Sequence, residues 1–570
     1  MHYDLVIRNG MLVDGSGGPR FPADIAVHGG RIVKIGRVRA PATRTIDADG
    51  LVVAPGFVDG HTHMDAQVFW DPLGSCSCYH GVTTVIMGNC GFTLAPCAED
   101  DADFVFRNLE RAEDLSRDAM RAGIQWRWET FREYLDAVDA LPKGINYGGY
   151  IGHSALRTFV MRERAFSEQA TPDELARMCH EVQDAVRAGA IGFSTSRTMN
   201  HLTSDDRPVA SRVADWDEVR AIVMAMGDTG AGIFELASEE PGRSPRRQRD
   251  YFDRLKHLAV DSGCPVTFGM PSIRIAPELW PAYYDLGDEV AAAGGRLFVQ
   301  AHSREISTLL SFKSHTPFDN WELWREVRAK PLDEQKVLFG DPAMKRRLVD
   351  IATRPYDGPK VVGAEARPPE WEWVYHFNGI RDQRRMSDIA AERGVAPVEA
   401  MIDLALERDF DCFFRQPLAN EDQDAVLKMM KHPRSVVTFS DSGAHVAQIM
   451  DSSLQTHLLS HWVRDREAFT LEQAVRMITQ DTAVAWGLYD RGLLREGLNA
   501  DIVLFDPDAI DQDMPELVND LPAGAQRLRQ TSRGIHYTIV NGEVLLEGNR
   551  PSGATPGRLV RGPLARTGTG

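Results

Sequence analysis

The chain has 570 residues, 43% of them hydrophobic and 26% charged, which is ordinary for a globular protein and suits one large barrel with attached pieces or two to three domains. Its formal net charge of −18 disfavours a nucleic-acid partner, because phosphate binding needs a basic face. There is no run of about 18 apolar residues, so we expect no membrane span.

The first residues, MHYDLVIRNGMLVDG, lack the basic start and apolar core of a secretory signal. Seven cysteines are too few for a disulfide scaffold in so long a chain. Cys76 and Cys78 form a C-x-C without a second cysteine pair, which we interpret as structural. These features predict a cytoplasmic protein, and they leave open a homo-oligomer.

Short strands of alternating apolar and polar residues, separated by glycine turns, occur near both ends of the chain. They cover residues 3–13, 24–27 and 31–35, and then 501–505, 536–540 and 543–546. Neither half has enough strands to be stable alone. We therefore expect residues 1–55 and 491–550 to form one small composite β-sandwich domain. The tail, 551–570, is expected to wrap the surface or to be disordered.

Strand-like apolar runs alternate with amphipathic helical stretches through the centre of the chain. The eight runs are 52–59, 83–87, 147–151, 190–193, 232–236, 266–268, 297–299 and 436–439. This pattern predicts the α/β class and a (β/α)8 TIM-like barrel over residues 56–490, with an open doubly wound sheet as the alternative. The long interval at about 304–434 is an insertion, for which a lid or pocket wall and a packed helical unit are equally good interpretations.

The strongest chemical signal follows the first barrel run, where His61 and His63 are two residues apart. In an extended segment this spacing puts both side chains on one side, and at a barrel mouth that side is the interior. Two imidazoles there can share one divalent ion such as zinc. By itself the H-x-H pattern is weak, since two polar loop histidines would give it as well.

The segment APGFVDGHTHMD resembles the first barrel strand of the amidohydrolase superfamily. GVTTVIMGNCG, GGYIGHSALR, GAIGFSTS and FSDSGAH are similar to segments of its D-aminoacylase branch, the N-acyl-D-amino-acid deacylases. ADIVLFDP and TIVNGEVLLEG resemble that branch's closing β-domain strands. The resemblance spans nearly the whole chain, but residues 304–434 match poorly.

This resemblance implies that His61 and His63 bind metal, that Cys90 is a metal-binding cysteine, and that Asp441 is both a ligand and the catalytic acid–base group. A thiolate is a good zinc ligand, and a carboxylate at a metal can move a proton from water to a leaving amine. The alternatives are a small buried cysteine and a helix N-cap aspartate.

The sequence departs from the branch where histidines are expected to end barrel strands five and six. Ungapped alignment puts Ala237 and Met270 there, and neither suits a divalent ion. We therefore expect one tightly bound ion, most simply Zn²⁺. Glu235, Glu239 or His302 could replace a missing ligand, although packing or surface roles suit them as well.

Polar side chains that follow strands three, four and seven are candidates for binding substrate. They are His153, Ser194, Arg197, His201, His302 and Arg304. An arginine among them could clamp a substrate carboxylate, although structural roles are common for such residues.

These features predict hydrolysis of the amide C–N bond of a small molecule, an N-acyl amino acid or a related compound, with neither D nor L preferred by the residues themselves. One alternative keeps the metal but changes the reaction to a lactone or cyclic-amide hydrolysis or a decarboxylation. Another is a non-catalytic binding protein on a decayed barrel.

Overall fold

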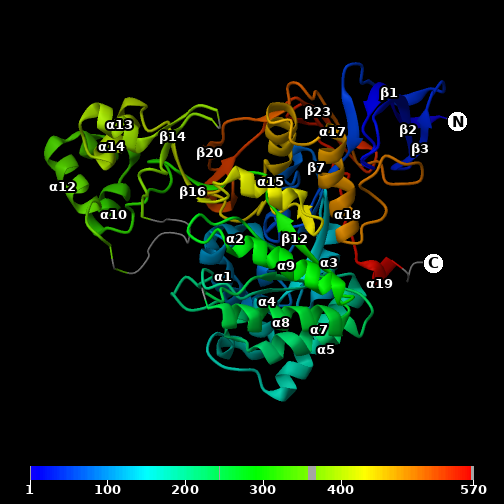
Figure 1. Cartoon of the computed structure of the whole chain (residues 1–570), viewed down its shortest axis with the longest axis horizontal. Coiled ribbons are helices and arrows are strands. Elements are labelled where there is room, and N and C mark those ends of the chain that lie inside the picture. The colour runs from blue at the N-terminus through cyan, green and yellow to red at the C-terminus, as the bar shows by residue number, and fades with distance from the viewer. Residues whose placement is uncertain (1, 243, 357, 359–367, 380, 567–570) are drawn as a thin grey trace.

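The computed structural model describes residues 2–242, 244–356, 358, 368–379 and 381–566. Three parts are visible in Figure 1: a central barrel, a sheet built from both chain ends, and an insertion that projects to the opposite side of the barrel from strands β1 to β3. Within these ranges, no helix combines the length and the apolar character needed to cross a membrane.

Eight parallel strands form the barrel sheet, and their spatial order follows their order in the chain. They are β6 (Phe57–Asp59), β7 (Val82–Met87), β8 (Asn146–Gly152), β9 (Gly192–Ser196), β10 (Ile233–Ala237), β11 (Val266–Gly269), β12 (Leu297–Ala301) and β17 (Ser435–Val437). The first and last strands meet just beyond their ends, in a parallel bridge between Thr62 and Ser442. Sequential order is typical of a barrel, whereas the order reverses in a doubly wound sheet. The predicted fold class is confirmed.

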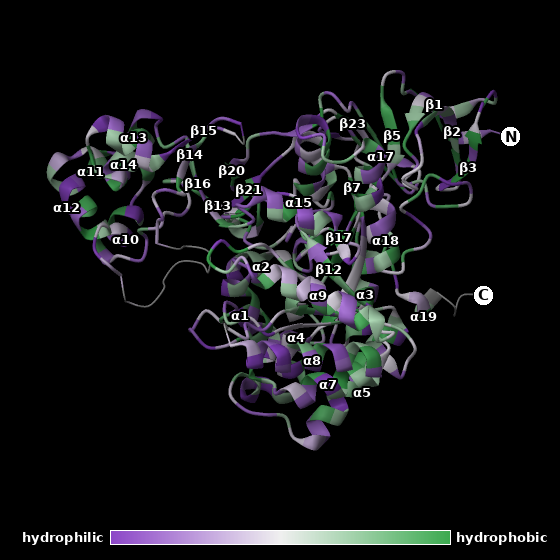
Figure 2. Cartoon of the chain, viewed as in Figure 1, coloured by the Kyte–Doolittle hydropathy of each residue, from purple (hydrophilic) through white to green (hydrophobic). Residues whose placement is uncertain are grey.

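Helices follow the barrel strands. They are α1 (Ala102–Ala112), α2 (Arg117–Gly123), α3 (Phe131–Ala140), α4 (His153–Met161), α5 (Pro172–Ala188), α6 (Ala210–Val213), α7 (Trp216–Gly227), α8 (Pro245–Ser262), α9 (Leu279–Ala292), α15 (Gln423–Lys431), α16 (Leu454–His457), α17 (Leu471–Arg476) and α18 (Thr482–Ala485). Helix α5 shows why they form. Thr171 and Glu174 make a capping box at its start, and Gly189 ends it with a φ of 116°. Hydrophilic and hydrophobic residues alternate along α5, α7 and α8 (Figure 2), as expected of helices with one face on a barrel.

The first predicted strand, 52–59, is divided in the structure at Gly56. Residues before it form β5 (Val52–Pro55) in the end sheet, and residues after it form β6 in the barrel. A Cβ at Gly56 would lie 2.2 Å from the Thr83 hydroxyl oxygen, so only glycine lets the chain pass so close to β7. The division ties the end sheet directly to the strand that leads to His61.

The two chain ends share one nine-stranded sheet. Its strands are β1 (Tyr3–Leu12), β2 (Phe21–His28), β3 (Arg31–Gly36), β4 (Ala42–Asp47), β5, β18 (Ile502–Phe505), β23 (Ile535–Val540), β24 (Glu543–Glu547) and β25 (Arg550–Pro551). The junction is β5, which pairs with β1 from the start of the chain and with β18 from its end. Two short antiparallel strand pairs, β19 (Asp511–Gln512) with β22 (Ser532–Arg533) and β20 (Glu516–Val518) with β21 (Arg527–Arg529), lie outside this sheet.

The insertion has its own four-stranded sheet and helices. In chain order they are β13 (Ile306–Leu310), α10 (Glu322–Arg328), α11 (Leu332–Gly340), α12 (Pro342–Ala352), β14 (Tyr375–Phe377), β15 (Gln383–Arg385), α13 (Met386–Arg393), α14 (Pro397–Glu407) and β16 (Phe413–Ala419). A separate aromatic core includes Phe318, Trp324, Phe339 and Phe410. The segment is therefore a packed unit, and its strands were not anticipated.

The tail packs on the barrel as far as it is described. Leu559 forms a parallel bridge with Tyr147 of β8, and Val560 donates a backbone hydrogen bond to Tyr147. The short helix α19 (Pro563–Arg566) follows. Residues 556–562 therefore lie against the barrel, whereas residues 567–570 lie outside the described part of the chain.

Candidate metal centre

The segments that follow β6 and β17 interlock at the barrel mouth and bring three predicted residues together. His63 donates a backbone hydrogen bond to Ser442 (2.7 Å), and Asp441 donates one to His61 (3.2 Å). These bonds place the Asp441 carboxylate between the two imidazoles. Its Oδ1 lies 3.1 Å from His61 Nε2 and 3.3 Å from His63 Nε2.

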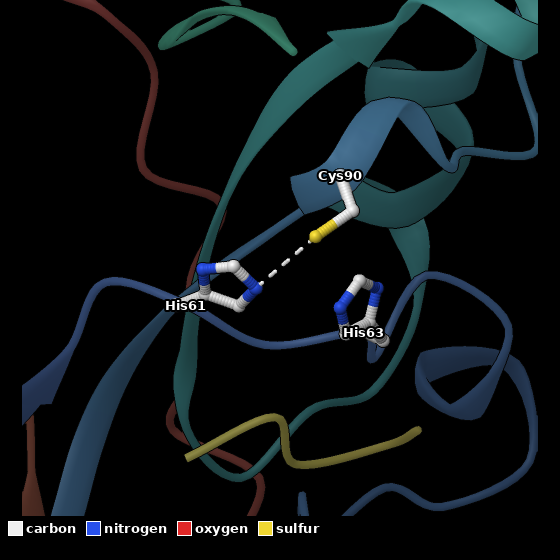
Figure 3. Close-up of side chains that lie close together, drawn as sticks. All are labelled: His61, His63 and Cys90. Carbon is white, nitrogen blue, oxygen red and sulfur yellow. Dashed lines mark hydrogen bonds between the residues drawn. The ribbon is translucent and has the colours of Figure 1, made fainter. Parts of the chain in front are cut away.

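Cys90 approaches the two histidines from the turn after β7 (Figure 3). Its Sγ lies 3.5 Å from His61 Nε2, and one ligand atom from each of His61, His63 and Cys90 lies within 4.8 Å of the others. Ser194 and Glu235 hold this turn. The Ser194 hydroxyl accepts from Gly91 N at 3.0 Å, and the Glu235 carboxylate accepts from Cys90 N at 2.7 Å.

Three separations within the cluster are compatible with a shared ion, although, among the described residues, only His61, His63 and Cys90 have ligand atoms that all lie within 4.8 Å of one another. A tetrahedral zinc with bonds of about 2.0–2.3 Å separates neighbouring ligand atoms by roughly 3.3–3.8 Å. The His61–Cys90 contact of 3.5 Å lies within that range, the His63–Asp441 contact of 3.3 Å lies at its lower end, and the His61–Asp441 contact of 3.1 Å lies just below it. Two imidazole nitrogens, a thiol and a carboxylate are also the donor types that zinc prefers.

Both Cys90 and Asp441 have left-handed backbone, with φ of 56° and 53°. Such a conformation is uncommon for residues other than glycine and persists only when the surroundings enforce it. Here the enforcing contacts are the hydrogen bonds from Cys90 N to Glu235 and from Asp441 N to His61. The strained backbone thus belongs to the two residues whose side chains face the histidines.

The electrostatics of the cluster favour a bound cation. Burial lowers the pKa of His61, but the hydrogen bond to Asp441 and the charges of Asp441 and Glu235 raise it to about 9. Burial would raise the pKa of Asp441, yet its contacts with His61 and His63 hold it well below the usual range. Carboxylates that stabilise a proton on His61 so strongly would also stabilise a divalent ion.

Gln300 at the end of β12 orients His61. Its side-chain oxygen lies 2.6 Å from His61 Nδ1, and its amide nitrogen donates to the Thr267 hydroxyl at 3.1 Å. Since an amide oxygen can only accept, Nδ1 carries a hydrogen, and Nε2, which faces Cys90 and Asp441, is the nitrogen that would bind an ion on losing its proton. Gln300 was not among the site residues predicted from the sequence.

Gln300→Leu is expected to weaken zinc binding by about 10- to 100-fold, because the variant no longer fixes the tautomer and orientation of His61. Zinc affinity measured by competition with a chromophoric chelator tests this. Gln423→Leu, on α15, is the control. Unchanged zinc affinity in Gln300→Leu would show that His61 needs no such support.

Glu235 and Glu239, both considered as replacement ligands, lie in different surroundings. Glu235 is completely buried, and its Oε1 lies 3.8 Å from His61 Nδ1. Burial raises its pKa to about 7. Glu239 instead forms ion pairs with Arg197 and Arg254. At the positions expected to hold histidines, Met270 is a buried core residue and Ala237 packs against the same core.

Two further residues near the cluster were missed. The Glu113 carboxylate lies 3.7 Å from His63 Nε2 and 3.8 Å from His445 Nε2. Glu113 comes from the loop between α1 and α2, which contains no recognisable motif. His445 belongs to the FSDSGAH segment, four residues after Asp441. This proximity could have marked it as a candidate site residue.

Of the six tentative substrate residues, Ser194 and His201 lie nearest the cluster. The Ser194 hydroxyl is hydrogen-bonded to the turn that carries Cys90. The His201 ring packs against Phe92, which in turn packs against His63, and its Nδ1 contacts the Ser196 hydroxyl at 2.8 Å. Among the six, His201 is thus the side chain best placed to meet a substrate at the metal centre.

His153 and Arg197 are engaged by protein groups. Both ring nitrogens of His153 have partners at 2.8 Å, the Thr195 hydroxyl and the Glu218 carboxylate. Arg197 pairs with Glu239 and donates to the backbone oxygens of Ser211 and Ala214. The structure does not bring these two side chains to the metal cluster.

His302 and Arg304 form a second buried group with Asp451. Arg304 donates to the Met450 backbone oxygen and the Ser453 hydroxyl, and it lies 3.7 Å from an Asp451 oxygen. His302 Nε2 lies 3.8 Å from the other Asp451 oxygen. Burial, followed by the charge of Arg304, lowers the pKa of His302 from 6.5 to about 3.

This shift predicts acid sensitivity. The unfolded chain protonates this histidine near pH 6.5 and the folded chain only near pH 3, so His302 destabilises the fold as the pH falls through that window. We expect His302→Gln to recover roughly 1 kcal/mol relative to wild type when the pH is lowered from about 7.5 to about 5.5. Urea unfolding at both pH values measures this.

His180→Gln is the matched control, because the His180 side chain is 68% exposed and it should track wild type at both pH values. If the difference in unfolding free energy between His302→Gln and wild type did not change with pH, a buried neutral His302 would be contradicted.

The sequence model described as "Amidohydrolase family" matches residues 44–546. The chain belongs to the amidohydrolase family. The family predicted from the motifs is therefore confirmed, and with it the expectation of a hydrolase.

Curated relatives of this amidohydrolase match over almost its full length. It is 28% identical to N-acyl-D-aspartate deacylase of Alcaligenes xylosoxydans xylosoxydans, over 98% of this chain and 95% of the relative. It is also 28% identical to D-aminoacylase of the same organism, over 99% of this chain and 98% of the relative. The solved structure of N-acyl-D-glutamate deacylase from Bordetella bronchiseptica, in complex with zinc and a phosphonate inhibitor, superposes with a TM-score of 0.65 at 23% identity, covering 98% of this chain and 100% of that chain. This likeness supports the fold described above.

Proposed function

We propose that this amidohydrolase is a zinc-dependent deacylase that cleaves the amide C–N bond of N-acyl-D-amino acids. The observation that carries the proposal is the convergence of His61, His63, Cys90 and Asp441 at the carboxyl ends of the barrel strands, where barrel enzymes place their catalytic residues. The D-amino-acid substrate class is supported by the relatives named N-acyl-D-aspartate deacylase and D-aminoacylase.

His61, His63, Cys90 and Asp441 would hold the ion. When bound, a divalent ion supplies Lewis acidity toward a carbonyl oxygen and makes water more acidic. Asp441 accepts the proton of the attacking water as the water oxygen bonds to the acyl carbon. It then delivers that proton to the amide nitrogen as the C–N bond breaks, which gives a carboxylic acid and a free amine.

Two features make Asp441 suitable for this proton transfer. It is ionised, because its contacts with His61 and His63 hold its pKa well below the usual range. Its side chain is 27% exposed, whereas those of His61 and His63 are 1% and 3% exposed, so it is the member of the cluster that a substrate can reach most readily. His201 would donate a hydrogen bond to the substrate from the β9 side of the site.

A single ion is part of the proposal. The histidines that would complete a second site are replaced by Ala237 and Met270, neither of which suits a divalent ion. A reducing, cytoplasmic location is also part of it, because all seven cysteines are free thiols and one of them must remain so to bind zinc.

The test is turnover by the purified full-length protein with added zinc. Substrates are the D and L forms of N-acetyl-aspartate, N-acetyl-glutamate and N-acetyl-methionine, with a lactone panel beside them, and product amine is quantified. We expect amine release from D forms, and none from chelator-treated protein. Zinc-dependent turnover of lactones alone would favour the alternative reaction, and no turnover of any compound would overturn the proposal.

A further inference from the structure

Glu235 is a buried acid inside the barrel that the proposed mechanism does not use. It lies two residues before Ala237 on β10, and since side chains alternate along a strand, the two share one face. Ile233, two residues earlier on that face, packs with interior residues of other barrel strands, including Val58, Ile86 and Phe298. Glu235 therefore points into the barrel, below the position where the family histidine is absent.

Only half of this carboxylate is satisfied by the protein. Oε2 accepts the hydrogen bond from Cys90 N at 2.7 Å. Oε1 is buried and forms no hydrogen bond with the described residues, and its nearest cationic neighbour is His61 Nδ1 at 3.8 Å, which is already hydrogen-bonded to Gln300. A buried carboxylate oxygen without a partner is costly, and metal coordination is one of the few ways to satisfy it.

The position of Glu235 also suits a ligand. Its hydrogen bond to Cys90 N holds the carboxylate next to the residue whose Sγ faces His61. Zinc is bound by carboxylate oxygens of Asp and Glu as well as by imidazole nitrogens and thiolates. The acid two residues below the absent histidine therefore lies beside the Cys90 turn, with its unpaired Oε1 3.8 Å from His61 Nδ1.

We propose that Glu235 is a ligand of the metal centre and that it supplies, from β10, the donor that Ala237 cannot. This inference rests on the proposed function, because it assumes that His61, His63, Cys90 and Asp441 hold an ion. It adds a metal ligand that the family resemblance does not assign.

Zinc binding by Glu235→Gln tests this without reference to activity. We expect the variant to bind zinc more than about 100-fold more weakly than wild type, beyond the roughly 10- to 100-fold effect of a group that only orients a ligand. Cobalt substitution gives a second readout, because loss of a ligand changes the visible absorption bands of bound Co²⁺. Glu239→Gln, four residues along and paired with Arg197 and Arg254, is the matched control and should bind zinc as wild type does.

A zinc affinity within tenfold of wild type, with an unchanged cobalt spectrum, would overturn the role of Glu235. His63→Ala, run in parallel, separates this result from failure of the proposed function. If His63→Ala loses zinc while Glu235→Gln keeps it, only the present inference fails, and if both keep zinc, both fail. Should Glu235→Gln not fold, zinc-soaked crystals of wild type decide. We expect a Glu235 oxygen about 2.0–2.2 Å from the ion, and a separation beyond about 3 Å would contradict the proposal.

Discussion

Asp441→Asn is expected to lower kcat by about 10²- to 10⁴-fold, the usual contribution of a positioned acid–base group. The amide of asparagine has nearly the volume of the carboxylate, so the hydrogen bond from Asp441 N to His61 and the packing of the segment should survive. What is lost is the group that accepts the proton of the attacking water. Steady-state kinetics with the best N-acyl-D-amino acid, at saturating zinc, measure the effect.

Asp422→Asn is the matched control for this variant. Asp422 caps the N-terminus of α15 by accepting from Asp424 N and Ala425 N, and asparagine caps helices equally well. Its activity should therefore equal that of wild type. If Asp441→Asn retained more than a tenth of wild-type kcat, Asp441 would not be the acid–base group, and another residue near His63, such as Glu113, would have to be considered.

His61→Ala is expected to abolish zinc binding and turnover together. The His61 imidazole contacts both Asp441 and Cys90, so the variant loses the ligand that lies next to both of these residues. In wild type, zinc at 100 times its dissociation constant should add about 2.7 kcal/mol to the unfolding free energy. Metal analysis after dialysis and the change in Tm on adding a chelator measure both effects.

The variant should contain almost no zinc, and its Tm should be unaffected by the chelator. His180→Ala, which removes a largely exposed histidine from α5, should match wild type in both respects. A His61→Ala protein that still bound one zinc per chain and turned over substrate would place the metal elsewhere.

The sequence predicted those parts of the site that lie on strand ends with recognisable motifs. His61, His63, Cys90 and Asp441 each follow a barrel strand, and strand order alone brings such positions to one mouth. Gln300 could also have been predicted, because it lies two residues after Phe298, a barrel-interior residue, on the same face of β12. Period-two alternation would have directed this polar side chain inward.

Other features depend on contacts that local sequence does not encode. Glu113 reaches His63 from a loop between helices, and its position depends on how α1 and α2 pack. The division at Gly56 depends on the Thr83 side chain of the neighbouring strand. The strands of the insertion, three to seven residues long, pair across up to about a hundred residues of chain, so their pattern is too short to be recognised.

The most direct test of the metal centre is a crystal structure of the zinc-loaded protein with diffraction data collected on both sides of the zinc absorption edge. We expect one anomalous peak per chain, about 2.0–2.3 Å from His61 Nε2, His63 Nε2 and a ligand atom of Asp441 or Cys90. No peak at the barrel mouth, or a peak whose ligands exclude His61 and His63, would contradict the account.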